Sequence, residues 1–165
     1  MQMKNIVKFL ALVLCLTALL ALCACDGEKI NTEVAPADIA NAIVNEMGSA
    51  DAMTALDESY ITGRMEIDLS NCAEYDVRLS TASINVNEFG VFKAKDVDHV
   101  EALDADVQAY LAMRLETWMD EYLPEEKPKV ENAQVRTFGP YVIYTILSES
   151  DSKIAIDTMS EMLTK

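Results

Sequence analysis

Two side chains with the chemistry of a nucleophile and a base occur in the middle of the sequence, Cys72 and His99, and His99 is the only histidine of the chain. A thiol and an imidazole can form the catalytic pair of a thiol protease or transpeptidase when a third group orients the base. No signature of such an enzyme surrounds Cys72 in LSNCAEY, and no third group can be named. A free cysteine is usually a small buried hydrophobic residue, and the sequence favours that interpretation.

His99 also lies among acidic residues, in the segment DVDHVEALDAD, which invites comparison with a calcium-binding loop. A loop of the EF-hand kind needs Gly at its sixth position and Glu at its twelfth. Counted from Asp96, these positions hold Glu101 and Val107, so the pattern fails. The acids suit the positively polarised start of a helix, and weak binding of a divalent cation is the alternative.

A third candidate is a polar binding patch made by Glu88, Lys93 and Lys95 on the segment NEFGVFKAK. The alternative is that the two lysines protect a strand end against pairing with another chain. The sequence favours this alternative over a binding patch. Among 28 acidic residues, carboxylate pairs of the kind that glycosidases use are available everywhere and carry no information. The sequence therefore predicts no catalytic, cofactor-binding or metal-binding residue.

The N-terminus has the pattern of an export signal. Lys4 and Lys8 precede an apolar run of 14 residues, FLALVLCLTALLAL, over 9–22. A membrane-spanning helix needs about 20 apolar residues, so this run is short for a span and suits a signal peptide. We expect residues 1–24 to be removed.

The cleavage site resembles a bacterial lipobox, Leu22-Cys23-Ala24-Cys25. A lipobox has Leu three residues before the modified cysteine and small residues in between. Cys23 fits less well than Cys25 because bulky Leu22 precedes it directly. The resemblance implies lipidation of the Cys25 sulfur and cleavage after Ala24, while the alternative is an ordinary secretory signal.

The mature chain is expected to consist of a lipidated Cys25, a flexible tether over 25–35 and one domain over 36–165. The signal removes two basic residues, which leaves 11 basic against 28 acidic residues, a net charge of −17. This charge argues against nucleic acid and anionic lipid as partners, so acyl chains would have to hold the protein on the membrane. Only Cys72 remains as a thiol, so the domain needs no internal disulfide.

Hydrophobic periodicity predicts helices and paired strands in the domain. The helices are expected over 36–47, 96–122 and 151–164, with a short helical segment through Met53, Leu56 and Tyr60. The strands are expected over 75–80, 84–95, 132–138 and 141–147, and Gly139-Pro140 is expected to form a type II′ turn. PEEKPK after Leu123 is expected to be a loop.

These elements predict an α+β fold with a single domain. An antiparallel sheet of about four strands is packed by the long amphipathic helix and by flanking N- and C-terminal helices, all on one face of the sheet. The long helix is expected to pack Val107, Leu111, Leu115 and Trp118 against the sheet. Gly90 is expected to permit a close approach in its strand.

Several segments together are similar to a family of small lipoproteins of Gram-positive bacteria, domain of unknown function 4358. They are the N-terminal anchor, NEFGVFKAKD, RLETWMDEYLP in the long helix, and VENAQVRTFGPYVIYTI near the C-terminus. The resemblance covers about residues 36–165 and rests on the order and spacing of these segments. It implies the fold and the membrane address, and it implies no activity.

Three functions remain open at this point. The first is a membrane-anchored binding module that holds a protein partner in the cell envelope, with a preference for basic partner surfaces. The second is an envelope hydrolase with an unidentified carboxylate pair. The third is a small solute-binding accessory to a transporter, although about 140 residues are few for the two lobes of a solute receptor.

Overall fold

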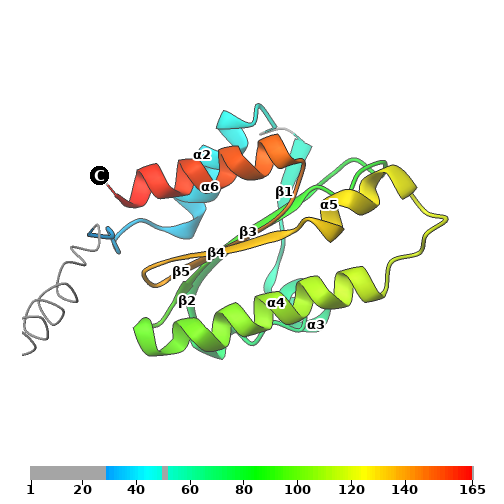
Figure 1. Cartoon of the computed structure of the whole chain (residues 1–165). Coiled ribbons are helices and arrows are strands. Elements are labelled where there is room, and N and C mark those ends of the chain that lie inside the picture. The colour runs from blue at the N-terminus through cyan, green and yellow to red at the C-terminus, as the bar shows by residue number, and fades with distance from the viewer. Residues whose placement is uncertain (1–28, 50–51, 165) are drawn as a thin grey trace, which may run out of the picture.

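The computed structural model describes residues 29–49 and 52–164 (Figure 1). The expected signal peptide and the expected lipidation site, Cys25, lie outside the described residues. The helices are α2 (Pro36–Glu46), α3 (Glu58–Gly63), α4 (Val100–Glu116), α5 (Lys127–Glu131) and α6 (Glu149–Leu163). The strands are β1 (Met53–Ala55), β2 (Cys72–Ser80), β3 (Glu88–Ala94), β4 (Gln134–Phe138) and β5 (Tyr141–Ile146). The 3-10 turns are η2 (Leu69–Asn71), η3 (Val97–His99) and η4 (Pro124–Glu126).

The strands form one antiparallel sheet in the order β1-β2-β3-β5-β4. The α+β fold is confirmed, with five strands in the described residues where the sequence predicted about four. The additional strand is β1, where Met53 pairs with Ser80. The prediction of one helical segment through Met53, Leu56 and Tyr60 is therefore wrong, and Tyr60 belongs to the separate helix α3.

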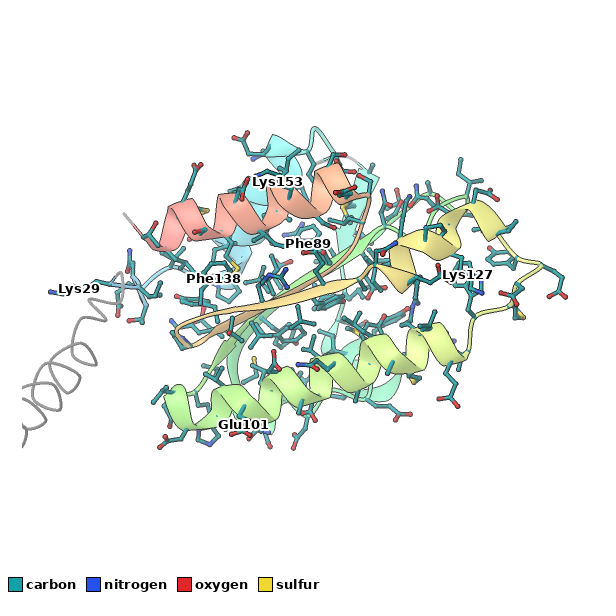
Figure 2. All side chains as sticks on the ribbon, in the orientation of Figure 1. Lys29, Phe89, Glu101, Lys127, Phe138 and Lys153 are labelled. Atoms are coloured by element: carbon teal, nitrogen blue, oxygen red, sulfur yellow. The ribbon has the colours of Figure 1, made fainter. Side chains whose placement is uncertain are left out.

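Helices cover both faces of the sheet, so the expectation that they share one face is wrong (Figure 1). One apolar core lies between the sheet and helices α2 and α6, and it contains Phe89 and Val91 of β3. The other lies between the sheet and helices α3 and α4, and it contains Phe92 and Ala94. Figure 2 shows side chains filling both spaces, with Phe89 on the side of α6. Because successive strand residues point to opposite faces, a strand that is apolar at every position needs a helix layer on each side.

Helix α4 is shorter than the sequence predicted and buries a different stripe. It ends at Glu116 rather than near Leu123. Its fully buried residues are Leu103, Val107 and Tyr110, which are spaced by three and four positions. Of the expected stripe, Val107 faces the core, Leu111 and Trp118 are partly buried, and Leu115 is 42% exposed. The helix therefore rests on the sheet mainly through its first three turns.

The segment PEEKPK is not a loop, because it contributes η4 and helix α5. Proline occupies the first turn of each, where a fixed φ favours a helix and no backbone donor is lost. The last hairpin is confirmed, since Phe138 pairs with Tyr141 across a two-residue turn. Gly139 has φ +55, as the first central residue of a type II′ turn requires.

The described chain packs on the domain before α2 begins. Ile30 and Val34 lie against the core between the sheet and helices α2 and α6. The N–H of Asn31 donates to the carbonyl of Leu163 at 2.7 Å, and the hydroxyl of Tyr141 donates to the carbonyl of Val34 at 2.7 Å. Because of these contacts, only part of the expected tether can be free of the domain. They also place the segment before α2 beside the C-terminus (Figure 1).

Candidate functional site

Helix α4 is fixed to the sheet by a buried carboxylate, Glu88, at the start of β3. Glu88 is 0% exposed. Its Oε1 accepts hydrogen bonds of 2.6 Å from the hydroxyls of Tyr110 on α4 and Tyr144 on β5. Arg114 Nη1 lies 3.9 Å from Oε2 at the outer side of the same cluster. A buried carboxylate is costly unless it is hydrogen-bonded, so the cluster holds α4 in one position over the sheet.

The approach of Tyr144 to Glu88 depends on Gly90, as the sequence predicted for a close approach in this strand. A Cβ on Gly90 would collide with the ring of Tyr144 and lie 3.1 Å from Val77. Burial, and then the carboxylate of Glu88, raise the pKa of the Tyr144 hydroxyl well above its ordinary value. The same two causes raise the pKa of Tyr110. Both hydroxyls therefore remain donors to the carboxylate.

On the other face, a buried polar contact fixes helix α6. Ser152 Oγ accepts a 3.0 Å hydrogen bond from Thr145 Oγ1 of β5, and both residues are buried. Ser148 caps the helix by accepting from the N–H of Asp151 at 3.1 Å. Tyr110 thus fixes α4 to Glu88 of β3, and Ser152 fixes α6 to Thr145 of the neighbouring strand β5. Strand β4 runs along the sheet edge between the two helices (Figure 1).

The outer side of β4 carries unshared backbone groups. In an antiparallel ladder, hydrogen-bonded and non-bonded pairs alternate, and the pair that closes a two-residue hairpin, Phe138 and Tyr141, is bonded. Arg136 and Gln134 are then bonded to β5 as well, while Val135 and Thr137 direct their N–H and C=O groups away from the sheet. In agreement, the carbonyl of Val135 accepts a hydrogen bond of 2.8 Å from Arg136 Nη1.

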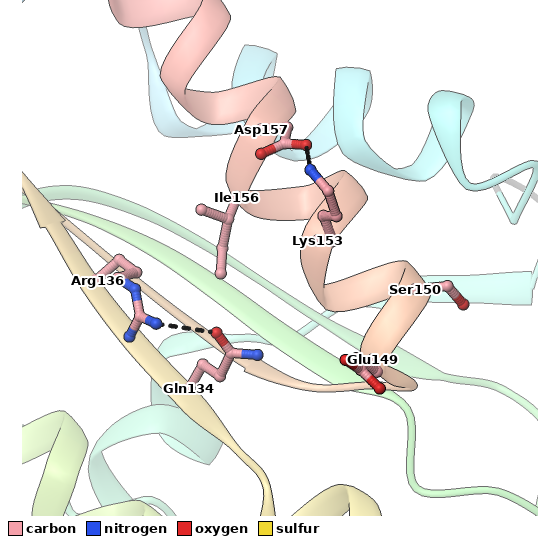
Figure 3. Close-up of a pocket in the computed structure, with 7 residues that line it drawn as sticks. All are labelled: Gln134, Arg136, Glu149, Ser150, Lys153, Ile156 and Asp157. Carbon is pink, nitrogen blue, oxygen red and sulfur yellow. Dashed lines mark hydrogen bonds and ion pairs between the residues drawn. The ribbon is translucent and has the colours of Figure 1, made fainter.

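A groove of about 670 Å³ lies beside this edge on the α6 side (Figure 3). Arg136 and Gln134 line it from β4, and their side chains are joined by a hydrogen bond of 3.2 Å. From α6 it is lined by a first-turn carboxylate, an apolar side chain and an ion pair, namely Glu149, Ile156 and Lys153–Asp157. The groove therefore carries two cations and two anions, in a protein whose overall charge is strongly negative.

A smaller hollow of about 370 Å³ lies beside the same edge on the α4 side. It is lined by Gln108 and Leu111 of α4 and by Ala133 and Val135 of the β4 segment. Since Tyr110 holds this part of α4 to Glu88, the wall of the hollow is rigidly placed. The edge of β4 thus has a charged groove on one face and, on the other, a hollow lined by Leu111, Ala133 and Val135 together with Gln108.

Cys72 and His99 each have other hydrogen-bond partners and do not form a catalytic pair. The Cys72 thiol is buried and donates to the carbonyls of Glu74 at 3.0 Å and Lys93 at 3.4 Å. Burial raises the pKa of this thiol to about 11, which is opposite to the lowered pKa that a nucleophilic thiolate needs. His99 Nδ1 lies 2.6 Å from Asp96 Oδ1, and this bond is the main cause of the lowered pKa of Asp96.

Glu88 does not form one surface patch with Lys93 and Lys95, which line a hollow together. Glu88 is buried at one end of β3, under α4. Lys93 lies at the other end and on the other face, over the ring of Tyr141 at 5.8 Å and 3.7 Å from Glu74. The alternative interpretation is wrong as well, because β3 is a central strand and needs no protection against edge pairing.

Two further observations concern the described part of the chain. Within residues 29–49 and 52–164, no three acidic, histidine or cysteine side chains are grouped as metal ligands. Over the same ranges, no helix has the length and apolar character of a membrane span. The edge of β4 was not singled out from the sequence, because only the strand order shows that QVRTF lies at the rim of the sheet.

Comparison with known protein families finds a match over most of this domain. The model of a family described as domain of unknown function (DUF4358) matches residues 46–147. The chain belongs to this family. No curated protein and no solved structure matches the sequence. The DUF4358 match contains α4 and the whole hairpin of β4 and β5, and it ends just before α6. The α6 wall of the charged groove therefore lies beyond the matched part.

Proposed function

We propose that this DUF4358 protein is a lipid-anchored binding module on the extracytoplasmic face of the membrane of a Gram-positive bacterium, and that it holds a protein partner in the cell envelope. The observation that carries the proposal is the open edge of β4. Outward backbone donors and acceptors stand there between two hollows whose walls are fixed by buried contacts. Sheet edges of this kind bind partner chains by strand addition.

The anchor rests on the pattern around Cys25. A diacylglycerol on the sulfur carries two acyl chains, which would give the stable attachment that one acyl chain does not give. Confinement near the bilayer raises the effective concentration of the domain toward other envelope proteins, so that weak contacts become productive. The net charge of −17 after signal removal favours a partner with a basic surface around the contact.

The buried carboxylate supports the binding function better than the hydrolase alternative. Glu88 is 0% exposed and engaged by Tyr110 and Tyr144, so it acts on the position of α4 and not on an external polymer. The solute-receptor alternative draws no support from the architecture, because one sheet with a helix layer on each face does not form two lobes.

The anchor is tested by replacing each candidate cysteine and fractionating cells. Cys25→Ala should release the protein from the membrane fraction, whereas Cys23→Ala should leave it there. The reverse result would assign the lipid to Cys23, and membrane retention of both variants would refute a thioether anchor.

The binding function is tested by cross-linking in whole cells. A photoreactive residue at Thr137, on the open edge, should give an adduct with a defined envelope protein, and the yield should fall at 1 M salt because the Debye length shrinks from about 8 to about 3 Å. The control is the same residue at Thr54, which is also exposed but lies on β1 at the opposite edge. Equal adducts from both positions, or cleavage of an envelope polymer by the purified protein, would contradict the proposal.

A further inference from the structure

We infer that the partner contributes an extended segment which adds to β4 as an antiparallel sixth strand, with an acidic side chain opposite Arg136 and an apolar side chain opposite Val135. This inference rests on the proposed binding function and specifies the chemistry of the partner. It follows from the backbone groups, the charge and the two hollows at the edge of β4.

The backbone groups fix the geometry of such a strand. Val135 and Thr137 each direct one N–H and one C=O outward, because their neighbours in the strand are bonded to β5. An antiparallel segment can pair with all four groups, and it would continue the pattern of a sheet that is antiparallel throughout. The other edge offers less, since β1 has three residues and β4 has five.

Arg136 covers one of these four groups in the free protein. Its Nη1 donates to the carbonyl of Val135 and its Nη2 to Oε1 of Gln134, and both acceptors are neutral. A guanidinium forms shorter and stronger bonds with a carboxylate than with neutral acceptors. A partner carboxylate can therefore draw Arg136 away from Val135, and the partner backbone then takes the released carbonyl.

The position of that carboxylate follows from the pleat of the sheet. Arg136 pairs with Ile143, whose side chain lies in the core on the α6 face. A partner residue opposite Arg136 consequently points into the groove on the α6 side (Figure 3). Its neighbours in the partner, opposite Val135 and Thr137, point to the α4 face. The residue opposite Val135 meets Leu111 and Ala133 and should be apolar.

A second copy of this chain fits the edge less well. In the antiparallel register that pairs all of β4 with its own copy, Arg136 stands opposite Arg136. Like charges directly opposite each other destabilise a strand pair, and each copy carries a large negative net charge. A different protein with a carboxylate at this position meets no such repulsion at Arg136.

The inference is tested with synthetic nine-residue peptides and the full-length protein in detergent. The probe has a central Thr-Asp-Val, which in antiparallel register stands opposite Thr137, Arg136 and Val135. N-methylation of its Val removes a donor that faces β4 and should weaken binding at least about tenfold. N-methylation of its Asp lies on the outward side and should leave the affinity within about twofold. Equal effects of the two methylations would overturn the strand geometry.

Charge selection is tested on the same probe. Replacing its Asp by Asn should weaken binding about fivefold, the size expected for an exposed charge pair, and Lys should weaken it further. Arg136→Gln should abolish the preference for Asp over Asn. Lys153→Gln is the matched control, because Lys153 lines the same groove but is paired with Asp157, and it should preserve the preference. A preference for Asp that survives Arg136→Gln would overturn the role of Arg136.

Failure of this inference can be told apart from failure of the proposed function. One outcome is an adduct from Thr137 in cells, but no saturable binding of any of these peptides up to about 1 mM, which corresponds to a binding free energy near −4 kcal/mol. This outcome would agree with the binding module and would overturn the extended acidic segment. Peptide binding with the expected methylation pattern, but with no adduct in cells, would support the edge chemistry and contradict the envelope partner.

Discussion

Removal of the Tyr144 hydroxyl measures how firmly the buried cluster holds α4. In Tyr144→Phe the ring remains and only the 2.6 Å hydrogen bond to Glu88 is lost. A hydrogen bond to a charged group contributes about 1.5–3 kcal/mol. With roughly 4 °C of melting temperature per kcal/mol for a domain of this size, we expect Tm to fall by about 6–12 °C.

The same variant changes the dependence of stability on pH. The pKa of Tyr144 is raised in the folded protein by burial and by Glu88, so the hydroxyl stays protonated where the unfolded chain has lost its proton. The stability it gives is fully present below pH 10 and is lost as the pH rises above that value. Each such tyrosine adds a slope of about 1.36 kcal/mol per pH unit, so Tyr144→Phe should flatten the alkaline limb by that amount.

Urea unfolding from pH 7 to 11, followed by the fluorescence of the single tryptophan, Trp118, measures both effects. Tyr75→Phe is the control, because Tyr75 packs against the same core without a hydrogen bond to Glu88. At neutral pH it should change stability by less than about 0.5 kcal/mol. A Tyr144→Phe protein as stable as the wild type at neutral pH would refute the role given to the cluster.

Three further predictions follow from the described contacts. Gly90→Ala should destabilise by about 1–3 kcal/mol because its Cβ displaces the Tyr144 ring, and calorimetry of Gly90→Ala in the Tyr144→Phe background should show a smaller loss. Leu103→Ala should lower the free energy of unfolding by about 2–5 kcal/mol. Leu115, on the same helix, is 42% exposed, so Leu115→Ala should lower it by less than about 1 kcal/mol in urea unfolding. Equal losses would mean that the buried stripe extends to Leu115, as the sequence predicts. Alkylation of Cys72 in the folded protein should reach half its maximal rate near pH 11, and a midpoint near 8.5, the ordinary thiol pKa, would contradict its burial.

Local patterns predicted most of the elements but not their layering. Helix α2, the last hairpin and the fold class follow from periodicity and from the turn at Gly139. The apolar spacing predicts the start of α6 two residues late, although Ser148 and Asp151 form a capping pair that marks it. The extent of α4 could not be predicted from its apolar spacing, because the length of the sheet beneath it decides which residues are covered.

The site was harder to predict than the fold. The sequence predicts a surface position for Glu88, because a charged side chain is almost never fully buried unless it is paired. Its partners, Tyr110 and Tyr144, are 22 and 56 positions away in the chain, and no local pattern connects them. The open edge of β4 depends on strand order, which results from β5 inserting between β3 and β4.

The amide hydrogen exchange rate of Thr137 tests the central claim most directly. Its N–H points outward from the edge strand, whereas the N–H of Arg136 is bonded to β5 and serves as an internal reference. In the free full-length protein, Thr137 should exchange near the rate of an unstructured peptide. Saturation with the Thr-Asp-Val peptide should slow its exchange at least about tenfold, equivalent to about 1.4 kcal/mol, and should leave Arg136 unchanged. An unchanged rate at Thr137 in the saturated complex would show that the partner segment does not bind as a strand on β4.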